Sequence, residues 1–270
     1  MNVCGMCARV AMVLTVVVCA SGTAAGQETP FEPVSGQAGK DVVWVPTPPE
    51  LVEKMLDLGK ITAQDIVMDL GSGDGRNIIG AAKRGATAIG VEYNPDMVRL
   101  SNRLAKEAGV SGKATFIEGD MYVADISKAT ALVLFLLPSN MLILRDKFFA
   151  LQPGSRIVSN TFTIQDWNAD EQITIDNCSA WCTALLYIVP AKIGGTWKTP
   201  EGDLTLVQDF QMLTGALVRP GGAEITVTGK LRGNEITLVT DGQEMKGTVR
   251  GATITGTRAK GGAWSASKVN

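Results

Sequence analysis

Between residues 47 and 158 the chain alternates short apolar runs with stretches in which apolar side chains recur at helical spacing. The apolar runs predict strands at 66–69, 88–92, 114–117, 131–136 and 156–158. The amphipathic stretches predict a helix that begins within residues 47–50 and further helices at 77–84, 95–108 and 140–151. Strands that alternate with helices favour an α/β fold with a parallel sheet covered by helices on both faces.

The expected helix ends carry the usual start and stop signals. Residues 47–50 are predicted to form a capping box, with proline at the first helical position. Asn94 is the expected N-cap of the helix that starts at Pro95, and Gly109 ends that helix. Periodicity and end signals therefore predict the same elements.

After residue 190 this alternation gives way to short β-type segments separated by glycine. Residues 229–233 (Gly-Lys-Leu-Arg-Gly) recur at 247–251 (Gly-Thr-Val-Arg-Gly), and each copy predicts a hairpin with its turn at Arg-Gly. Successive hairpins form an all-β meander that can curl into a small barrel, with Trp197 and Trp264 filling its interior. A packing module without a ligand is one reading of this part, and a binding module is the other.

The first 27 residues have the layout of a secretory signal peptide. Arg9 is their single charged side chain, and an apolar run at 10–20 leads into small residues. This run is shorter than the roughly 20 residues that span a membrane, and Val18 before Cys19 argues against lipid attachment. We expect export to the periplasm or the medium, with no membrane association after cleavage.

The expected division is a signal peptide at 1–26, an α/β domain at 27–191 and a β-rich accessory domain at 192–270.

The cysteines, the charge and the absence of histidine limit the possible chemistry. Cys178 and Cys182 remain after cleavage; an oxidising compartment permits a disulfide, and two small buried thiols fit the spacing as well. The sequence has no histidine, which excludes Ser-His and Cys-His catalytic pairs and argues against a metal site. A net charge of −2, with the Lys and Arg residues scattered, provides no basic surface. We therefore expect no metal and no nucleic-acid partner.

A glycine-rich loop at 69–76 follows the first strand and opens a helix, where backbone N–H groups can meet a ligand. Arg76 stands where a dinucleotide-binding loop has its third glycine, which argues against an NAD-dependent oxidoreductase. The loop also lacks the Gly-Lys-Ser/Thr of ATP- and GTP-binding loops. A nucleoside ligand without a pyrophosphate is the remaining candidate.

Acidic residues at three strand ends favour S-adenosylmethionine as this ligand. Asp69 can accept its cationic amine, Glu92 both ribose hydroxyls, and Asp120 the adenine amino group. Glycine in the loop allows the backbone to approach the ligand closely. The expected cofactor-binding residues are Asp69, Gly71, Ser72, Gly73, Gly75, Glu92 and Asp120.

These motifs resemble those of the class I S-adenosylmethionine-dependent methyltransferases, and more narrowly a bacterial group related to the small mitochondrial protein-lysine methyltransferases. The likeness covers residues 42–197. It lies in residues 45–48, 69–76, 90–92, 135–138, 156–160, 166–167, 189–191 and 195–197. The resemblance implies a Rossmann-like sheet, S-adenosylmethionine as cofactor, and methyl transfer to an acceptor such as a protein lysine amine.

The acceptor stays open between a protein and a small molecule. Residues 137–139 (Leu-Pro-Ser) replace the Asn/Asp-Pro-Pro-Tyr/Phe motif of amino- and DNA-methylating relatives, which argues against DNA. Asn160 stands where relatives often carry histidine, so we assign no catalytic residue. The expected apolar walls of the acceptor pocket are Phe135, Leu137, Pro138 and Trp167. Because export would separate an enzyme from cytosolic S-adenosylmethionine, a non-catalytic nucleoside-sensing or interaction scaffold is the alternative.

Overall fold

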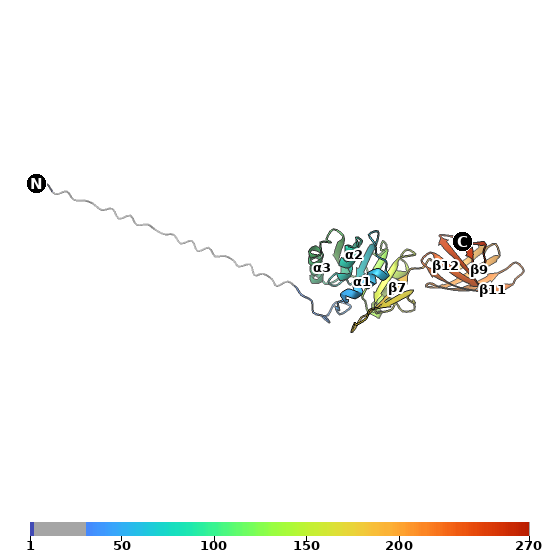
Figure 1. Ribbon diagram of the computed structural model, residues 1–270, viewed down its shortest axis with the longest axis horizontal. Helices are drawn as coiled ribbons and strands as arrows, with labels where there is room; N and C mark the ends of the chain where they lie inside the picture. Colours follow the sequence, from blue (N-terminus) through green and yellow to red (C-terminus); the bar gives the residue numbers. More distant parts are fainter. Residues whose placement is uncertain (3–30, 270) are drawn as a thin grey trace. The chain divides into compact units, whose positions relative to one another are not determined.

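The part of the chain before residue 190 contains a seven-stranded sheet (Figure 1). The structure is a computed structural model, and it describes residues 1–2 and 31–269. The strands are β1 (Ile66–Leu70), β2 (Thr87–Glu92), β3 (Ala114–Glu118), β4 (Ala131–Leu134), β5 (Arg156–Asn160), β6 (Glu171–Thr174) and β7 (Thr183–Ile188). Their order in the sheet is β3-β2-β1-β4-β5-β7-β6, which confirms the predicted Rossmann-like arrangement.

Helices cover both faces of this sheet. They are α1 (Pro49–Leu58), α2 (Arg76–Lys83), α3 (Pro95–Glu107) and α4 (Pro138–Phe149). Neighbouring residues of a strand point to opposite faces. In β1, Val67 shares a buried cluster with Leu51 of α1 and Ile78 of α2, whereas Met68 shares one with Met141 of α4. The first three helices therefore lie on one face and α4 lies on the other.

The last two strands make the sheet mixed. The predicted parallel sheet is confirmed for β1 to β5, whereas both β5 and β6 pair antiparallel with β7 at this edge. The loop between β6 and β7 closes a hairpin, which requires antiparallel strands. A disulfide joins Cys178 and Cys182 within this loop, with the two Cα atoms 5.8 Å apart. Of the two readings of this cysteine pair, the structure has the disulfide.

The start of α1 differs from the predicted capping box. Pro48 is the N-cap and has no capping side chain, because its ring offers no hydrogen-bond acceptor. Thr47 is buried, and its Oγ1 accepts a hydrogen bond from Asn160 Nδ2 at 3.3 Å. The carbonyl of Thr47 accepts another from Arg76 Nη1 at 2.6 Å. Thr47 thus ties the segment before α1 to the end of β5 and to the loop after β1.

The chain after residue 194 forms a closed antiparallel barrel, part of which is labelled in Figure 1. Its strands are β8 (Gly195–Thr199), β9 (Gly202–Asp209), β10 (Met212–Val218), β11 (Glu224–Arg232), β12 (Glu235–Thr240), β13 (Gln243–Arg250), β14 (Thr253–Arg258) and β15 (Ala263–Lys268). The two repeated hairpins turn at Gly233 and Gly251, whose φ angles are 61° and 59°. Trp197 and Trp264 are buried in the barrel core, so the predicted small barrel is confirmed.

Residues 32–270 cluster as one compact unit. Val189 belongs to the core on the α4 face of the sheet, whereas Ala191 and Ile193 belong to the barrel core. Phe210, between β9 and β10, stacks on Trp167 with ring centroids 5.1 Å apart. The domain boundary near residue 191 stays a prediction.

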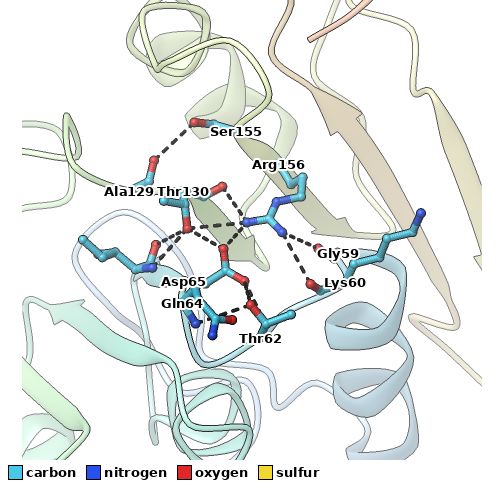
Figure 2. Close-up of polar contacts among 10 residues, drawn as sticks. Gly59, Lys60, Thr62, Gln64, Asp65, Ala129, Thr130, Ser155 and Arg156 are labelled. Atoms are coloured by element: carbon cyan, nitrogen blue, oxygen red, sulfur yellow. Dashed lines mark hydrogen bonds and ion pairs between the residues drawn. The ribbon is translucent and has the colours of Figure 1, made fainter. Parts of the chain in front are cut away.

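An ion pair between Asp65 and Arg156 joins the amino ends of β1, β4 and β5. The glycine-rich loop lies at the opposite, carboxyl end of β1. Figure 2 shows Asp65 among Thr62, Thr130 and Arg156. Asp65 accepts from the amide of Thr62 at 2.8 Å and from Thr130 Oγ1 at 2.7 Å, and it pairs with Arg156 Nη2. Burial by itself would raise the pKa of Asp65, but these hydrogen bonds lower it below its ordinary value.

We expect Asp65→Asn to lower the free energy of unfolding by about 1–3 kcal/mol at neutral pH, because Arg156 loses its charged partner. Since the folded state lowers the pKa of Asp65, the contribution is complete above the unfolded pKa of about 3.9 and is lost as the pH falls further. Urea unfolding over a pH series should therefore show the parent and the variant converging below about pH 4. Asp57→Asn, which breaks an exposed ion pair with Arg84, is the control and should cost little. A gap between parent and Asp65→Asn that does not depend on pH would contradict this account.

The predicted signal peptide lies outside the described residues. Within 31–269 and the first two residues, the structure contains no helix that is long and apolar enough to cross a membrane.

Candidate functional site

A cavity opens at the carboxyl ends of β1, β2 and β4, the edge of the sheet where the glycine-rich loop lies. Open α/β sheets bind their ligands at this edge. The cavity is lined by residues 37–47, residues 69, 71–74, 76 and 77, residues 91–94, Met97, residues 119–121, residues 135–137, Phe162 and Trp181. No barrel residue from the described part of the chain is among them.

The glycine-rich loop is held in place by hydrogen bonds to the end of β2. The amides of Gly71 and Ser72 donate to the carbonyl of Val91 at 2.8 and 3.0 Å, and the amide of Gly73 donates to Glu92 Oε2 at 2.9 Å. Gly71 and Gly73 both have positive φ, at 74° and 56°. A Cβ at Gly73 would lie 2.7 Å from Nε1 of Trp44. The loop therefore requires glycine for its backbone and for the contact with Trp44.

Gly75 serves packing and not the cavity, although we expected it to contact the cofactor. It does not line the cavity, and a Cβ there would lie 2.5 Å from the ring of Phe116. Gly90 in β2 has a similar task, because a Cβ there would lie 2.6 Å from Ser72 Oγ. These two glycines let the loop and α2 lie close to the sheet.

Asp69 is the most buried acid of the cavity, with 3% of its surface exposed. Its Oδ2 accepts from Asn77 Nδ2 at 3.0 Å, while its Oδ1 has no hydrogen-bond partner. Burial raises the pKa of Asp69 well above its ordinary value; the hydrogen bond from Asn77 opposes this, and the nearby charges of Glu92 and Asp74 add to it. A cationic group beside Oδ1 would supply the missing donor and stabilise the carboxylate.

Glu92 and Asp120 lie at the same cavity with different partners. Glu92 accepts from the amide of Gly73 through Oε2 and from the amide of Asn94 through Oε1, both at 2.9 Å. Each of its oxygens keeps a lone pair for a further donor. Asp120 accepts from the amide of Tyr122 at 2.9 Å and pairs with Lys40 Nζ at 3.1 Å, and both contacts lower its pKa.

Three buried polar atoms at this cavity lack hydrogen-bond partners, and together they fit the amino acid end of S-adenosylmethionine. They are Asp69 Oδ1, Ser72 Oγ and Asn77 Oδ1. Buried polar atoms are normally paired, so an acceptor-rich site of this kind calls for a ligand with donors. An ammonium group meets Asp69 and Asn77, and the hydroxyl of Ser72 suits a carboxylate.

Two of the four residues predicted for the acceptor pocket lie at the cavity. Phe135 and Leu137 line it, whereas Pro138 begins α4 and does not. The prediction for Trp167 is wrong, because that side chain is 2% exposed and packs in the core against Phe210. Trp167 serves the contact with Phe210 of the barrel, which the sequence pattern does not reveal.

Four further residues at the cavity were not predicted from the sequence. Trp44 covers Gly73, and Lys40 pairs with Asp120. Both belong to residues 36–44, where Gly36 and Trp44 are joined by a backbone hydrogen bond of 2.8 Å. Phe162 and Trp181 also line the cavity. The motif at 45–48 could have indicated that its neighbour Trp44 lies at the site. No local sequence pattern indicates a position at the cavity for Trp181.

Comparisons with known proteins identify the family of this chain. The model of the ANTKMT methyltransferase domain family matches residues 69–171. A protein-lysine N-methyltransferase of Saccharolobus islandicus is 40% identical over 151 residues, which are 55% of this chain and 94% of that protein. The adenine nucleotide translocase lysine N-methyltransferase of Mus musculus is 36% identical over 37% of this chain, and the match spans less than half (45%) of that protein.

A solved structure supports the same conclusion and adds a bound ligand. In the crystal structure of an RNA methyltransferase from Salinibacter ruber in complex with S-adenosyl-L-homocysteine, the protein is 40% identical in sequence to this chain. It aligns with a TM-score of 0.52 and covers 55% of this chain and 96% of that one. The alignments thus span nearly all of two relatives, one of which binds S-adenosyl-L-homocysteine. The chain belongs to the family of these enzymes and is an S-adenosylmethionine-dependent methyltransferase.

Proposed function

We propose that the methyl acceptor is the side-chain amine of a protein lysine. The observation that carries this proposal is the shape of the cavity, which continues from the buried Asp69 to the apolar side chains of Phe135 and Leu137. An alkyl chain fits such walls, and its terminal nitrogen would then approach the glycine-rich loop. Relatives named as protein-lysine and adenine nucleotide translocase lysine methyltransferases support the same acceptor.

The acceptor amine must lose its proton before it can take the methyl group. Burial of the nitrogen lowers the pKa of a lysine, whereas ring faces and carboxylates hold its ammonium form, so the side chain enters as an ammonium ion and loses its proton before transfer. When bound, S-adenosylmethionine supplies a methyl group on a sulfonium whose sulfur leaves as a neutral thioether. The chain therefore has to align the acceptor, exclude water and release one proton to solvent. Asn160 is buried and donates to Thr47, so it holds the segment before α1 instead of taking that proton.

The charges at the cavity favour lysine over RNA, the acceptor class in the name of the Salinibacter ruber relative. RNA binding rests on cations that neutralise phosphates. The two cationic residues that line the cavity already have partners: Lys40 pairs with Asp41 and Asp120, and Arg76 pairs with Asp74. The net charge of −2 adds no attraction for a polyanion.

Transfer of labelled methyl groups tests the acceptor. The full chain, supplied with methyl-labelled S-adenosylmethionine and a periplasmic extract of its host, should label protein, and acid hydrolysis should release the label as methyl-lysine. Prior acetylation of the lysines in the extract should abolish the labelling. Label that nuclease removes, or label found in another amino acid, would overturn the proposal.

We also propose that the enzyme acts outside the cytosol. The signal-like pattern of residues 1–26 supports export, and so does the disulfide between Cys178 and Cys182, since such bonds persist in oxidising compartments. Intact mass measured on the protein from its native host tests this, because export predicts a chain that starts near residue 26. A cytosolic chain with its first residues intact would contradict export. Export also requires a supply of S-adenosylmethionine outside the cytosol.

A further inference from the structure

Three aromatic side chains pack together at the apolar end of the cavity. The ring centroids of Phe135, Phe162 and Trp181 lie 5.4–6.0 Å apart pairwise, and all three residues line the cavity. They come from three separate places in the fold: the end of β4, the segment after β5, and the loop between β6 and β7. We refer to these three side chains as the aromatic wall.

Phe162 is fixed in the aromatic wall by its backbone. Its amide donates to the carbonyl of Asn160 at 2.6 Å, and its carbonyl accepts from Ser159 Oγ at 2.7 Å. Thr161, between them, has a φ of 59°, an uncommon value for a β-branched residue. The end of β5 thus holds one ring of the wall in a defined position.

Trp181 is positioned by the disulfide loop. It lies between Cys178 and Cys182, next to the second cysteine, and it is 38% exposed, an unusual exposure for a tryptophan. Its own φ is 60°, in the left-handed region that bulky residues avoid. The amide of Ile175 donates to the carbonyl of Cys182 at 3.0 Å and closes the base of the loop. The covalent bridge therefore keeps Trp181 against Phe135 and Phe162, where a free loop would have other conformations available.

The acids that line the cavity outnumber its cations, which favours a cationic ligand. The acids that line the cavity are Asp41, Asp69, Asp74, Glu92 and Asp120, against two cations, Lys40 and Arg76, that are themselves paired. An electron-rich ring face attracts an ammonium group, and a net acidic cavity adds to that attraction. A nucleobase would also stack on such rings, but its phosphates would meet the carboxylates.

We infer that the aromatic wall is the acceptor subsite, and that Trp181 selects acceptors that carry an alkylammonium group, with the disulfide as its positioning device. This inference rests on the proposed lysine acceptor and extends it to Phe162 and Trp181, for which neither the sequence nor the comparisons give a role. Because methylation leaves a permanent positive charge on a trimethylated lysine, the same rings also hold the methylated forms of the side chain.

Calorimetry on the full chain saturated with S-adenosylhomocysteine tests this subsite. The probes are the blocked amino acid N-acetyl-trimethyllysine N-methylamide and its neutral isostere, in which carbon replaces the charged nitrogen. We expect the cation to bind about 3- to 10-fold more tightly than the isostere in the parent. Trp181→Ala should remove that preference, Trp181→Phe should retain part of it, and both variants should bind S-adenosylhomocysteine as the parent does.

The disulfide is tested separately with Cys178→Ser/Cys182→Ser, which keeps Trp181 but frees its loop. We expect this variant to bind the cationic probe several-fold more weakly than the parent with unchanged affinity for S-adenosylhomocysteine. Near-ultraviolet circular dichroism shows that each variant is folded. Equal affinity of the parent for cation and isostere, or a preference that survives in Trp181→Ala, would overturn the inference.

The same variants separate this inference from the proposed acceptor. If the extract is labelled on lysine and Trp181→Ala labels it with an unchanged KM, the aromatic wall is not the subsite although the acceptor is correct. If Trp181 governs the cation preference but no lysine is labelled, the subsite stands and the acceptor is another amine. Adenosine monophosphate that binds only when Trp181 is present, without any cation preference, would instead show a wall that stacks bases.

Discussion

Gly73→Val should reduce the affinity for S-adenosylhomocysteine about 100-fold or more, which corresponds to at least about 2.7 kcal/mol. Gly73 has a φ of 56°, where a β-branched residue is strained, and its new Cβ would lie 2.7 Å from Trp44 Nε1. The amide of Gly73 also donates to Glu92, so a shift of this backbone moves two parts of the cofactor site at once. Calorimetry with S-adenosylhomocysteine measures the loss.

Gly109→Val is the matched control for this substitution. Gly109 follows α3 with a φ of 72°, and a Cβ there would meet nothing within 4 Å. Both variants therefore carry the same kind of backbone strain, of about 1–2 kcal/mol, but Gly109 lies outside the cavity lining. We expect Gly109→Val to lose stability in urea and keep its affinity. If Gly73→Val binds as tightly as Gly109→Val, the loop is not the cofactor site.

Glu92→Ala should weaken the binding of S-adenosylhomocysteine by roughly one to two decades, or about 1–3 kcal/mol. A carboxylate with two acceptor oxygens matches the vicinal hydroxyls of a ribose, and Glu92 already has one backbone donor on each oxygen. Removing it leaves two amides and two ligand hydroxyls without partners. Glu92→Gln retains one acceptor oxygen and should fall between the parent and the alanine variant.

Glu118→Ala is the control for Glu92→Ala. Glu118 is the register partner of Glu92 at the end of the neighbouring strand β3, is exposed, and does not line the cavity. The two substitutions remove the same negative charge from adjacent strand ends. A difference in affinity between them therefore measures the hydrogen bonds of Glu92 to the ligand and not the general electrostatic effect of one charge. Equal affinity of parent and Glu92→Ala would refute the assignment of the ribose to Glu92.

Much of the fold was predictable because its signals are local. The alternation of apolar runs and amphipathic stretches marked β1 to β5 and the four helices to within a few residues, since burial on one face sets the period of each element. The repeated Gly-x-Leu/Val-Arg-Gly motif marked two hairpins because glycine supplies the positive φ at Gly233 and Gly251. The edge strand β6 escaped prediction because all of its residues are exposed and lack an apolar face.

The cofactor part of the site was also predictable from sequence, and the acceptor part was predictable only for Phe135 and Leu137. Asp69, Glu92 and Asp120 follow strands, and parallel strands bring their carboxyl ends to one edge of the sheet. Trp167 was misplaced because an aromatic residue at a loop gives the same local signal in a core and in a pocket. It became core through Phe210, which lies far away in the chain and reaches it only in the folded state.

By itself, the sequence determined the order of the elements, the class of cofactor and the barrel, because each depends on spacing within a few residues. Tertiary structure alone decided that Phe162 and Trp181 join Phe135 at the cavity and how the sheet ends. Phe135, Phe162 and Trp181 meet only after β5, β6 and β7 have paired and the disulfide has closed the loop between the last two. Contacts between residues far apart in the chain depend on the packing of whole elements, and no local periodicity records that packing.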